Sequence, residues 1–332
     1  MAVAWKYVVS FSLWATLFSA GFGYAESLIL PASAEGSPII RIASVLPEDL
    51  VEVGNAPYAS LAGLAFGSQE AQERQQQAVQ QTGLPLEVKT RKTGIVFRLM
   101  PPGTFLMGSP PTESGRSSDE TQHQVTLTKA FYCGKFAVTQ ARWQQVMGTN
   151  PSDFKNAGED APVEHVRWQD CQAFVKKLCV TEGVAEGTYR LLTEAQWEYA
   201  CRAGTPTPFC YGPDLDSSLA NFNGNYAYGA GLKGVSRATT VSVGSFRPNA
   251  WGLYDMHGNV WEWCQDWYAT PYPSGPQTDP LGPPSGDYRV LRGGSWNYNA
   301  RYCRSAFRFW FTPVYRDGDV GLRLARTTPS YP

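Results

Sequence analysis

Residues 252–263 read GLYDMHGNVWEW, in a half of the chain that is rich in turns and poor in helix formers. Two acidic residues in this stretch, Asp255 and Glu262, stand seven positions apart. Gly258 and Val260 lie between them and can turn backbone carbonyls inward. Calcium in proteins takes about six to eight oxygen ligands from carboxylates and carbonyls. The stretch therefore predicts a calcium-binding loop, with the alternative that both carboxylates only hydrogen-bond the loop.

The chain around this stretch has the pattern of a mixed α+β protein. Thr139 is expected to cap a helix that runs through residue 147. Thr193 and Gln196 form a capping box that opens another helix, through residue 200. Helical spacing of apolar residues and short apolar runs complete the prediction with a helix at 168–178 and two strand pairs, 96–100 with 104–108 and 124–127 with 131–136.

The composition excludes several functional classes. The 332 residues carry a formal net charge of −1, so the chain has no basic excess for nucleic acid or for an anionic membrane surface. Hydrophobic residues make up 43% and charged residues 17%, which is typical of a globular protein with a sizeable core. The 11 Trp, 32 Gly and 24 Pro favour a loop-rich fold with few short helices and strands.

Residues 1–25 have the features of a secretory signal peptide. Lys6 precedes an apolar run over residues 8–22, and Gly23-Tyr24-Ala25 is a small-x-small cleavage site. The alternative is an uncleaved anchor, but the run is short for a bilayer that needs about 20 residues. We therefore expect an exported protein, periplasmic, cell-surface or secreted, without a membrane span after cleavage.

Residues 26–85 are expected to be a lead-in or linker. The first part, 26–66, is rich in proline and has no clear pattern. Residues 68–82 are good helix formers without an apolar stripe, so we expect a helix that is mostly solvated. Gly83 and Pro85 would end it.

The chain has seven cysteines, all after the signal segment. In an exported protein some of them are expected to pair, although the pairing is not readable from sequence. The three histidines are scattered and no Cys-x-x-Cys occurs, so a zinc site is not predicted.

Six phrases of the sequence, in order, resemble the formylglycine-generating-enzyme (sulfatase-modifying-factor) family. They are residues 102–109 (PGTFLMGS), 161–163 (APV), 190–200 (RLLTEAQWEYA), 252–263, 292–296 (RGGSW) and 321–324 (GLRL). The resemblance implies one domain over residues 86–328 with a C-type-lectin-like fold. It also implies a calcium ion at Asp255, Gly258, Val260 and Glu262, and a remnant of a second calcium site at Asn221 and Phe222.

The same resemblance raises the question of catalysis. Members of this family oxidise a sulfatase cysteine to formylglycine with a copper ion that two cysteine thiolates bind. Cys303 matches the second thiolate, but Tyr298 stands where the first is expected. A phenol with a pKa of about 10 does not replace a thiolate, and soft thiolates are what Cu(I) prefers. Copper is therefore not expected; if the chain is an enzyme, Cys303 and Ser295 are its candidate catalytic residues.

Residues 289–326 resemble the variable region of the target proteins of diversity-generating retroelements, which use this fold. Such regions keep a fixed frame and vary at positions that the template encodes as Asn. The frame would comprise 293–296, 300–301, 303–306, 308, 312–313, 316 and 321. The variable, ligand-binding positions would be Tyr298, Asn299, Tyr302, Phe307, Phe309, Trp310, Phe311, Val314, Tyr315, Asp317, Gly318 and Asp319. Trp is not reachable from an Asn codon by adenine changes, so Trp310 departs from the pattern.

The residue types of this region agree with a binding role. Seven of the variable positions are aromatic and arginines are interspersed among them. Tyr, Trp and Arg dominate binding hot spots because they bury a large rigid area at low entropic cost. We expect about a third of these positions to be core and the rest to form one face, with Arg301, Arg304, Arg308 and Arg316 beneath it or paired with Asp317 and Asp319.

Three functions follow from these observations. The first is a non-catalytic binding protein that displays a diversified aromatic face to an unknown protein or cell-surface ligand on a calcium-braced scaffold. The second is a formylglycine-generating oxidase with an incomplete copper site. The third is a structural or envelope-assembly protein that uses the scaffold without a variable face.

Overall fold

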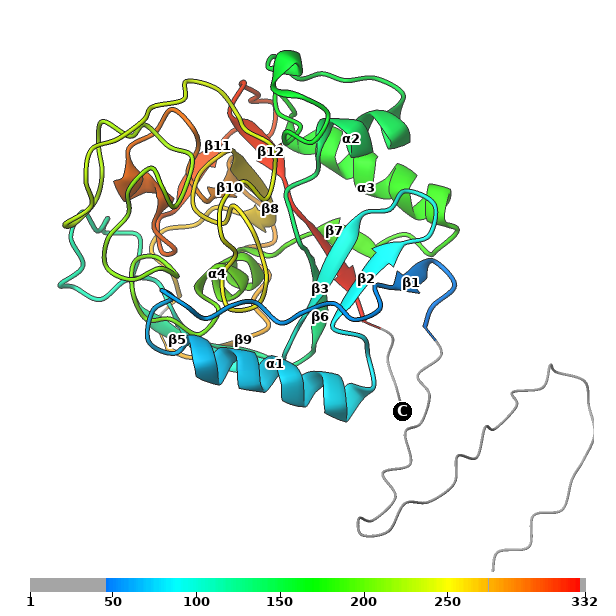
Figure 1. Ribbon diagram of the computed structural model, residues 1–332, viewed down its shortest axis with the longest axis horizontal. Helices are drawn as coiled ribbons and strands as arrows, with labels where there is room; N and C mark the ends of the chain where they lie inside the picture. The colour runs from blue at the N-terminus through cyan, green and yellow to red at the C-terminus, as the bar shows by residue number, and fades with distance from the viewer. Residues whose placement is uncertain (1–45, 274, 329–332) are drawn as a thin grey trace, which may run out of the picture. The chain divides into compact units, whose positions relative to one another are not determined.

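The computed structural model describes residues 46–273 and 275–328. The expected signal peptide, 1–25, and the first part of the lead-in lie outside these residues. The described part is one compact unit that contains four α-helices and several small sheets. This is the expected α+β fold with few short elements (Figure 1).

A six-stranded antiparallel sheet spans the width of the unit. Its strands, in spatial order, are β1 (Leu50–Glu52), β2 (Glu87–Thr90), β3 (Val96–Met100), β6 (Phe131–Gly134), β13 (Leu324–Thr327) and β7 (Tyr189–Leu191). The first and last strands of the chain thus belong to one sheet. β13 lies between β6 and β7, so the C-terminal segment completes the sheet from its interior.

Two smaller sheets complete the β structure. The four-stranded sheet has the order β11 (Phe309–Phe311), β10 (Arg289–Arg292), β8 (Trp261–Trp267) and β12 (Val320–Leu322). The three-stranded sheet consists of β4 (Gly103–Met107), β5 (His123–Leu127) and β9 (Gln277–Thr278). Strands β10, β11 and β12 of this sheet fall within residues 289–326, and β11 carries three of the variable positions, Phe309, Trp310 and Phe311.

The strand pairs expected around residues 96–136 are wrong in their partners. The segments 96–100 and 104–108 do not pair with each other. β3 instead pairs with β6, with Met100 opposite Phe131, and β4 pairs with β5, with Gly103 opposite Leu127. The two segments form one long antiparallel ribbon that passes from one sheet into the other at Pro101-Pro102, because a proline without an N–H interrupts the ladder there.

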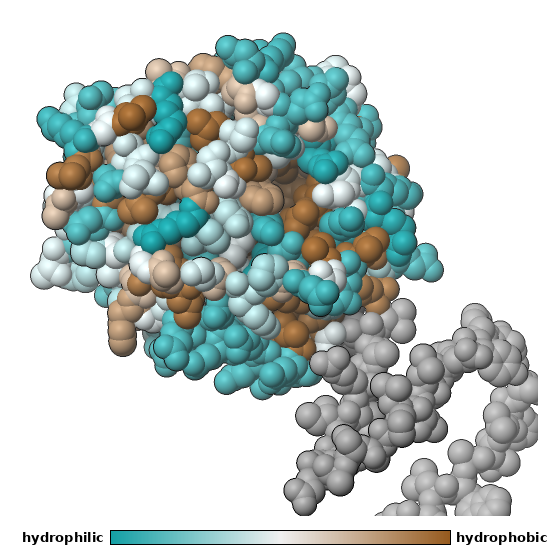
Figure 2. Space-filling view, in the orientation of Figure 1, coloured by the Kyte–Doolittle hydropathy of each residue, from teal (hydrophilic) through white to brown (hydrophobic). Residues whose placement is uncertain are grey.

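Two of the helices, α2 (Gln140–Met147) and α4 (Glu194–Arg202), begin directly after the predicted capping residues Thr139 and Thr193. The other α-helices are α1 (Ser68–Thr82) and α3 (Trp168–Glu182), with short 3₁₀ helices at Lys155–Ala157 and Ala300–Cys303. Thr139 accepts a hydrogen bond from Arg142 N, and Thr193 forms the expected capping box with Gln196. Figure 2 shows that the exposed side of α1, along the lower edge, is hydrophilic.

The expected linker is, over its described residues, part of the domain. Leu50 is a core residue, and Asp49 forms a buried ion pair with Arg326 of β13 at 2.7 Å. Within α1, the Gln75 side chain donates to Leu99 O at 2.8 Å, and Ala71 O accepts from Trp251 Nε1 at 2.7 Å. These buried polar contacts tie residues 46–85 to the sheet, which local composition did not indicate.

Buried arginine–carboxylate pairs connect the elements of the interior. Among the described residues, nine pairs have both side chains almost fully buried: Arg98–Glu87, Arg202–Glu198, Arg292–Glu194, Arg292–Glu198, Arg304–Glu113, Arg304–Glu120, Arg308–Glu194, Arg323–Glu262 and Arg326–Asp49. Removing one partner of such a pair leaves an uncompensated buried charge, which costs about 3–5 kcal/mol. The pairs therefore specify which loops pack together in a fold with little regular structure.

Candidate functional site

Aromatic side chains gather around Trp261, the first residue of β8. The Trp261 ring stacks on Phe309 of β11 with centroids 5.0 Å apart, and the Tyr298 ring meets it edge-on at 5.2 Å. Tyr302 meets both Tyr298, at 5.4 Å, and Phe307, at 4.9 Å. These contacts bring residues from the Gly-Gly-Ser loop, the second 3₁₀ helix and β11 onto one tryptophan.

The group continues along β11 to the following turn. Phe309 meets Phe311 at 5.6 Å, and Phe311 stacks on Tyr315 at 3.6 Å. We call the whole set the aromatic cluster: Trp261, Tyr298, Tyr302, Phe307, Phe309, Phe311 and Tyr315. Trp261 Nε1 is buried without a hydrogen-bond partner, so its N–H faces only the surrounding rings.

The twelve positions expected to bind ligand divide by exposure. Trp310, Val314 and Asp317 are exposed, and six positions are half-buried: Tyr298, Asn299, Tyr302, Phe309, Phe311 and Tyr315. Phe307, Gly318 and Asp319 are buried. By contrast, the frame residues 303–306 and 308 between them are all buried. Interior and surface residues thus alternate along the region.

Trp310 does not join the aromatic cluster. Successive side chains of a strand point to opposite faces, and Phe309 and Phe311 occupy the face with Trp261. Trp310 instead contacts Tyr288 at 4.4 Å and Tyr268 at 5.5 Å. The expectation of a single aromatic face is therefore wrong for Trp310, and no local pattern predicted that Tyr268 and Tyr288 would contact it.

Two carboxylates border the cluster at the turn after β11. Tyr315 OH donates to Asp317 Oδ2 at 3.1 Å, and Asp319 Oδ2 accepts from Ser295 Oγ at 2.9 Å. Burial raises the pKa of Asp319 to about 6. Burial, followed by the charges of Asp319 and Asp317, raises the pKa of Tyr298. The Tyr298 hydroxyl thus stays protonated and can donate a hydrogen bond.

Of the two roles expected of the arginines, support from beneath and pairing with Asp317 or Asp319, Arg304 and Arg308 have the first. Arg304 bonds Glu120 at 2.7 and 2.8 Å, and Arg308 bonds Glu194 at 2.7 and 2.9 Å. Both arginines are buried and support the region from beneath. Arg301 is exposed and lies over the Tyr302 ring at 4.7 Å. Arg316 is also exposed.

Cys303 is buried in a different hydrophobic cluster from the one that Tyr298 contacts. Its carbonyl oxygen accepts from His257 Nδ1 at 2.8 Å, and burial raises the pKa of its thiol far above the ordinary value. Cys201 lies beside the same imidazole, 3.8 Å from both ring nitrogens. Since Cys210 N donates to His257 Nε2 at 3.1 Å, both imidazole nitrogens are used by the backbone. Cys303 is therefore held as a protonated core residue.

The expected disulfides are absent among the described residues. Each cysteine there is free and buried: Cys133, Cys171, Cys179, Cys201, Cys210, Cys264 and Cys303. Their sulfurs fill core positions in the way small apolar side chains do.

The expected calcium ligands are only partly available as oxygen donors. Asp255 is buried, its Oδ2 accepts from Gly244 N at 2.7 Å, and its Oδ1 has no hydrogen-bond partner. Glu262 accepts from Arg323 at 2.8–3.0 Å and from Trp197 Nε1 at 2.6 Å. Asp255 Oδ1 is thus free to bind a cation, whereas the Glu262 carboxylate is already paired with Arg323.

The backbone of this loop is tightly constrained. Gly258 has φ +103°, and a Cβ there would lie 2.3 Å from Asn221 O, so only glycine fits. Val260 N donates to Gly258 O at 3.1 Å. Asn221 donates to Asn259 Oδ1 at 3.0 Å, while its own Oδ1 is buried and unpaired. In the described ranges no three His, Cys, Asp or Glu side chains converge on a metal position.

Comparison with known proteins identifies the scaffold. Residues 85–328 match the family described as "Sulfatase-modifying factor enzyme 1-like domain". The chain belongs to this family. The formylglycine-generating enzyme of Streptomyces coelicolor is 36% identical over 197 residues, which are 57% of this chain and 59% of that protein. The chain thus spans less than two thirds of the length of that relative.

Other relatives of this sulfatase-modifying-factor domain have different names. The chaperone protein LppX of Paenibacillus barcinonensis is 31% identical over 252 residues, covering 63% of this chain and 84% of that protein. Among solved structures, Treponema denticola variable protein 1 aligns with a TM-score of 0.58 and 28% identity, over 74% of this chain and all of that one. PvdO from Pseudomonas aeruginosa aligns with a TM-score of 0.61 and 30% identity, over 72% and 97%. The C-type-lectin-like fold and the likeness to a variable protein are both confirmed.

Proposed function

We propose that this member of the sulfatase-modifying-factor family is an exported binding protein that presents the aromatic cluster and its carboxylate border to a protein or cell-surface ligand. One observation carries the proposal: within residues 298–317 the frame residues 303–306 and 308 are buried, whereas six of the seven variable aromatic positions, all but Phe307, are exposed or half-buried. A scaffold whose interior is fixed and whose surface positions are separately accessible can change its ligand without changing its fold.

The half-buried rings suit recognition. Tyr298, Phe311 and Tyr315 are held by ring contacts with their neighbours, so little side-chain freedom is lost when a ligand covers them. The hydroxyls of the tyrosines and the carboxylate of Asp317 supply directional hydrogen bonds at the border. This combination of rigid apolar area and polar edge is typical of binding hot spots.

The oxidase alternative lacks the donors that its copper requires. Cys303 is a buried thiol, and Tyr298, at the position of the other thiolate, packs against Trp261. Cu(I) needs accessible, deprotonated sulfur, and neither residue offers it. No catalytic step is therefore assigned to these residues.

The deciding experiment measures both activities on the purified protein. Cu(I) titration and an aldehyde assay on a Cys-x-Pro-x-Arg peptide are expected to show neither tight copper nor turnover. A protein and glycan array is then probed with wild type, Phe311→Ser and Phe66→Ser, the last being an exposed aromatic control outside the cluster. A ligand kept by Phe66→Ser and lost by Phe311→Ser supports the proposal, whereas stoichiometric copper with turnover contradicts it.

We also propose calcium as a structural ion of the 252–263 loop. Asp255 Oδ1 would supply the free charged oxygen, and Gly258 and Val260 the backbone carbonyls. Glu262 would share its charge between the ion and Arg323. Export, through the 1–25 segment, belongs to the same proposal; none of the helices between residues 46 and 328, residue 274 aside, is long and apolar enough to span a bilayer.

A further inference from the structure

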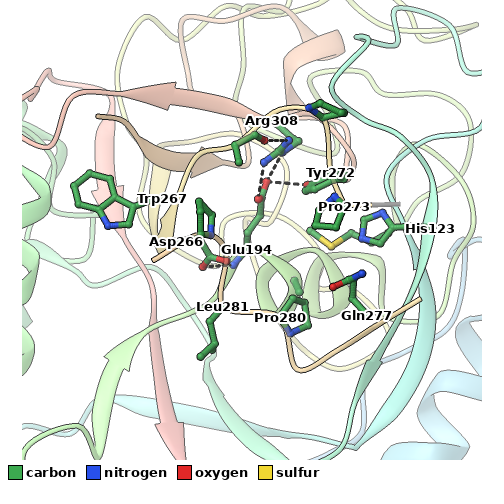
Figure 3. A pocket seen from close by; sticks show the side chains of 16 residues that line it. His123, Glu194, Asp266, Trp267, Tyr272, Pro273, Gln277, Pro280, Leu281 and Arg308 are labelled. Atoms are coloured by element: carbon green, nitrogen blue, oxygen red, sulfur yellow. Dashed lines mark hydrogen bonds and ion pairs between the residues drawn. The ribbon is translucent and has the colours of Figure 1, made fainter. Parts of the chain in front are cut away.

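A hollow separate from the aromatic cluster is lined by none of the residues of that cluster. It has a volume of about 360 Å³ and opens between the start of α4, the end of β8 and the segments 269–273 and 277–283 (Figure 3). This volume falls in the range of small-molecule sites, roughly 300–1,000 Å³. No residue that the proposed function uses for ligand contact lines it.

One acidic group in the hollow is already neutralised. Glu194 accepts two hydrogen bonds from Arg308, at 2.7 and 2.9 Å, and a third from Tyr272 OH at 2.8 Å. Arg308 also donates to Asp119 O and Ala269 O, at 3.2 and 2.9 Å. Glu194 and Arg308 thus form the floor and have no free charge to offer a ligand.

Asp266 provides a free acceptor. It is 4% exposed, and its Oδ2 accepts from Glu194 N at 2.8 Å. No other described residue donates a hydrogen bond to this carboxylate. Gly282 lies against it, so closely that a Cβ there would be 3.2 Å from Oδ1.

His123 provides a second acceptor. Its Nδ1 lies 3.0 Å from Thr121 O, and because a carbonyl only accepts, Nδ1 must carry the proton. In the neutral ring Nε2 is then an unprotonated acceptor, and no described residue donates to it. In Figure 3, Asp266 and His123 lie on either side of the Glu194 side chain. Asp266 and His123 therefore each present an acceptor to the hollow.

Apart from Tyr272 and Gln277, the remaining walls are apolar. They are formed by Met107, Trp267, Pro271, Pro273, Pro280, Leu281 and Pro283. Apolar walls with a few fixed polar groups are the usual composition of a ligand pocket, in which the polar groups determine orientation. We propose that this hollow binds a small molecule with a primary ammonium group on an apolar body, the ammonium donating to Asp266 and the body packing on the proline-rich loop.

The electrostatics agree with this assignment. Burial, and after it the charge of Glu194, raises the pKa of Asp266 to about 7. Arg308 acts in the opposite direction, and Arg190 and Arg289 also lie within electrostatic reach. A bound ammonium would favour the carboxylate form, so binding at pH 7 should release about half a proton.

Calorimetry on the purified protein tests the proposal. Benzylamine is titrated at pH 7 against benzyl alcohol, its neutral analogue, in two buffers of different ionisation enthalpy. Asp266→Asn keeps the acceptor for Glu194 N but removes the charge. Asp287→Asn changes an exposed aspartate elsewhere and is the matched control.

The expected result is benzylamine binding to wild type and Asp287→Asn, with affinity for Asp266→Asn lower by about tenfold or more. Benzyl alcohol should bind all three equally weakly. Absence of benzylamine binding to wild type, or equal affinity for Asp266→Asn, would overturn the proposal. Should Asp266→Asn not fold, wild type alone decides: benzyl alcohol binding as tightly as benzylamine would also overturn the proposal.

The ammonium could come from a free amine or from a lysine side chain. Nα-acetyl-lysine methylamide is therefore titrated in parallel. Tighter binding of this compound than of benzylamine identifies a protein lysine as the source, and weaker binding identifies a free amine.

Discussion

Arg308 and Glu194 form a two-point ion pair, with N–O distances of 2.7 and 2.9 Å, across 114 residues of sequence. The pair fixes the variable region onto the first turn of α4. Its neighbours Phe307 and Phe309 belong to the aromatic cluster, so the position of that cluster depends on a buried charge that carries no ligand contact.

Replacing Arg308 should therefore destabilise the folded protein. We expect Arg308→Gln to lower the free energy of unfolding by about 3 kcal/mol, because Glu194 loses its two-point partner and keeps only the more distant Arg292, at 3.7 Å. Urea denaturation followed by tryptophan fluorescence measures the change. Arg316→Gln, on the exposed turn nearby, is the control and should change it by less than about 0.5 kcal/mol.

The accessible positions of the variable region should tolerate polar residues. Tyr315→Asn is expected to cost about 1 kcal/mol, since the ring is half-buried and loses mainly its stack on Phe311. Phe307→Asn, in the interior, should cost about 3–5 kcal/mol. Thermal melts of both variants give the comparison, and equal losses would mean that the cluster is core rather than surface.

Calcium, if it binds the 252–263 loop, should depend on pH through Asp255. Burial raises the pKa of this carboxyl from 3.8 to about 6. The stability of the fold therefore falls as pH rises toward and through 6 and the buried carboxyl ionises. A bound calcium ion would offset this loss. The calcium-induced rise in melting temperature should be larger at pH 7.5 than at pH 5. A rise of the same size in Asp255→Asn would assign the ion to another position.

Restoring the missing sulfur should not create a copper site. We expect Tyr298→Cys to bind no Cu(I) in competition with a chelating dye, because Cys303 stays buried and protonated beside Cys201. Tight binding of one equivalent would show instead that the region rearranges to bring both sulfurs together.

The cysteines should be unreactive in the folded protein. Burial raises the pKa of the Cys133 and Cys201 thiols to about 12, and all seven cysteines are buried. A thiol reagent should modify fewer than one cysteine per chain under native conditions and all seven in urea. Fewer than seven in urea without reductant would reveal disulfides.

The sequence predicts this fold well where a local signal exists. Thr139 and the Thr193–Gln196 box mark two helix starts because capping depends on residues within one turn. The partners of β3 and β4 were wrong because apolar alternation shows that a segment is a strand but not which strand it pairs with.

The sequence predicted which residues belong to the candidate site better than it predicted how they are arranged in space. The positions of Tyr298, Phe309 and Phe311 follow from the motif order, but the separation of Trp310 required the register of β11. Glu194 and Asp266 come from distant segments, and the sequence contains no feature that would have placed them at one hollow.

The ion pair between Asp49 and Arg326 has a consequence for how the molecule can be attached to something else. It holds the start and the end of the described chain next to each other, while β11 lies in another part of the unit in Figure 1. A tether near either residue, natural or engineered, would therefore leave the variable strand away from the support to which the protein is fixed.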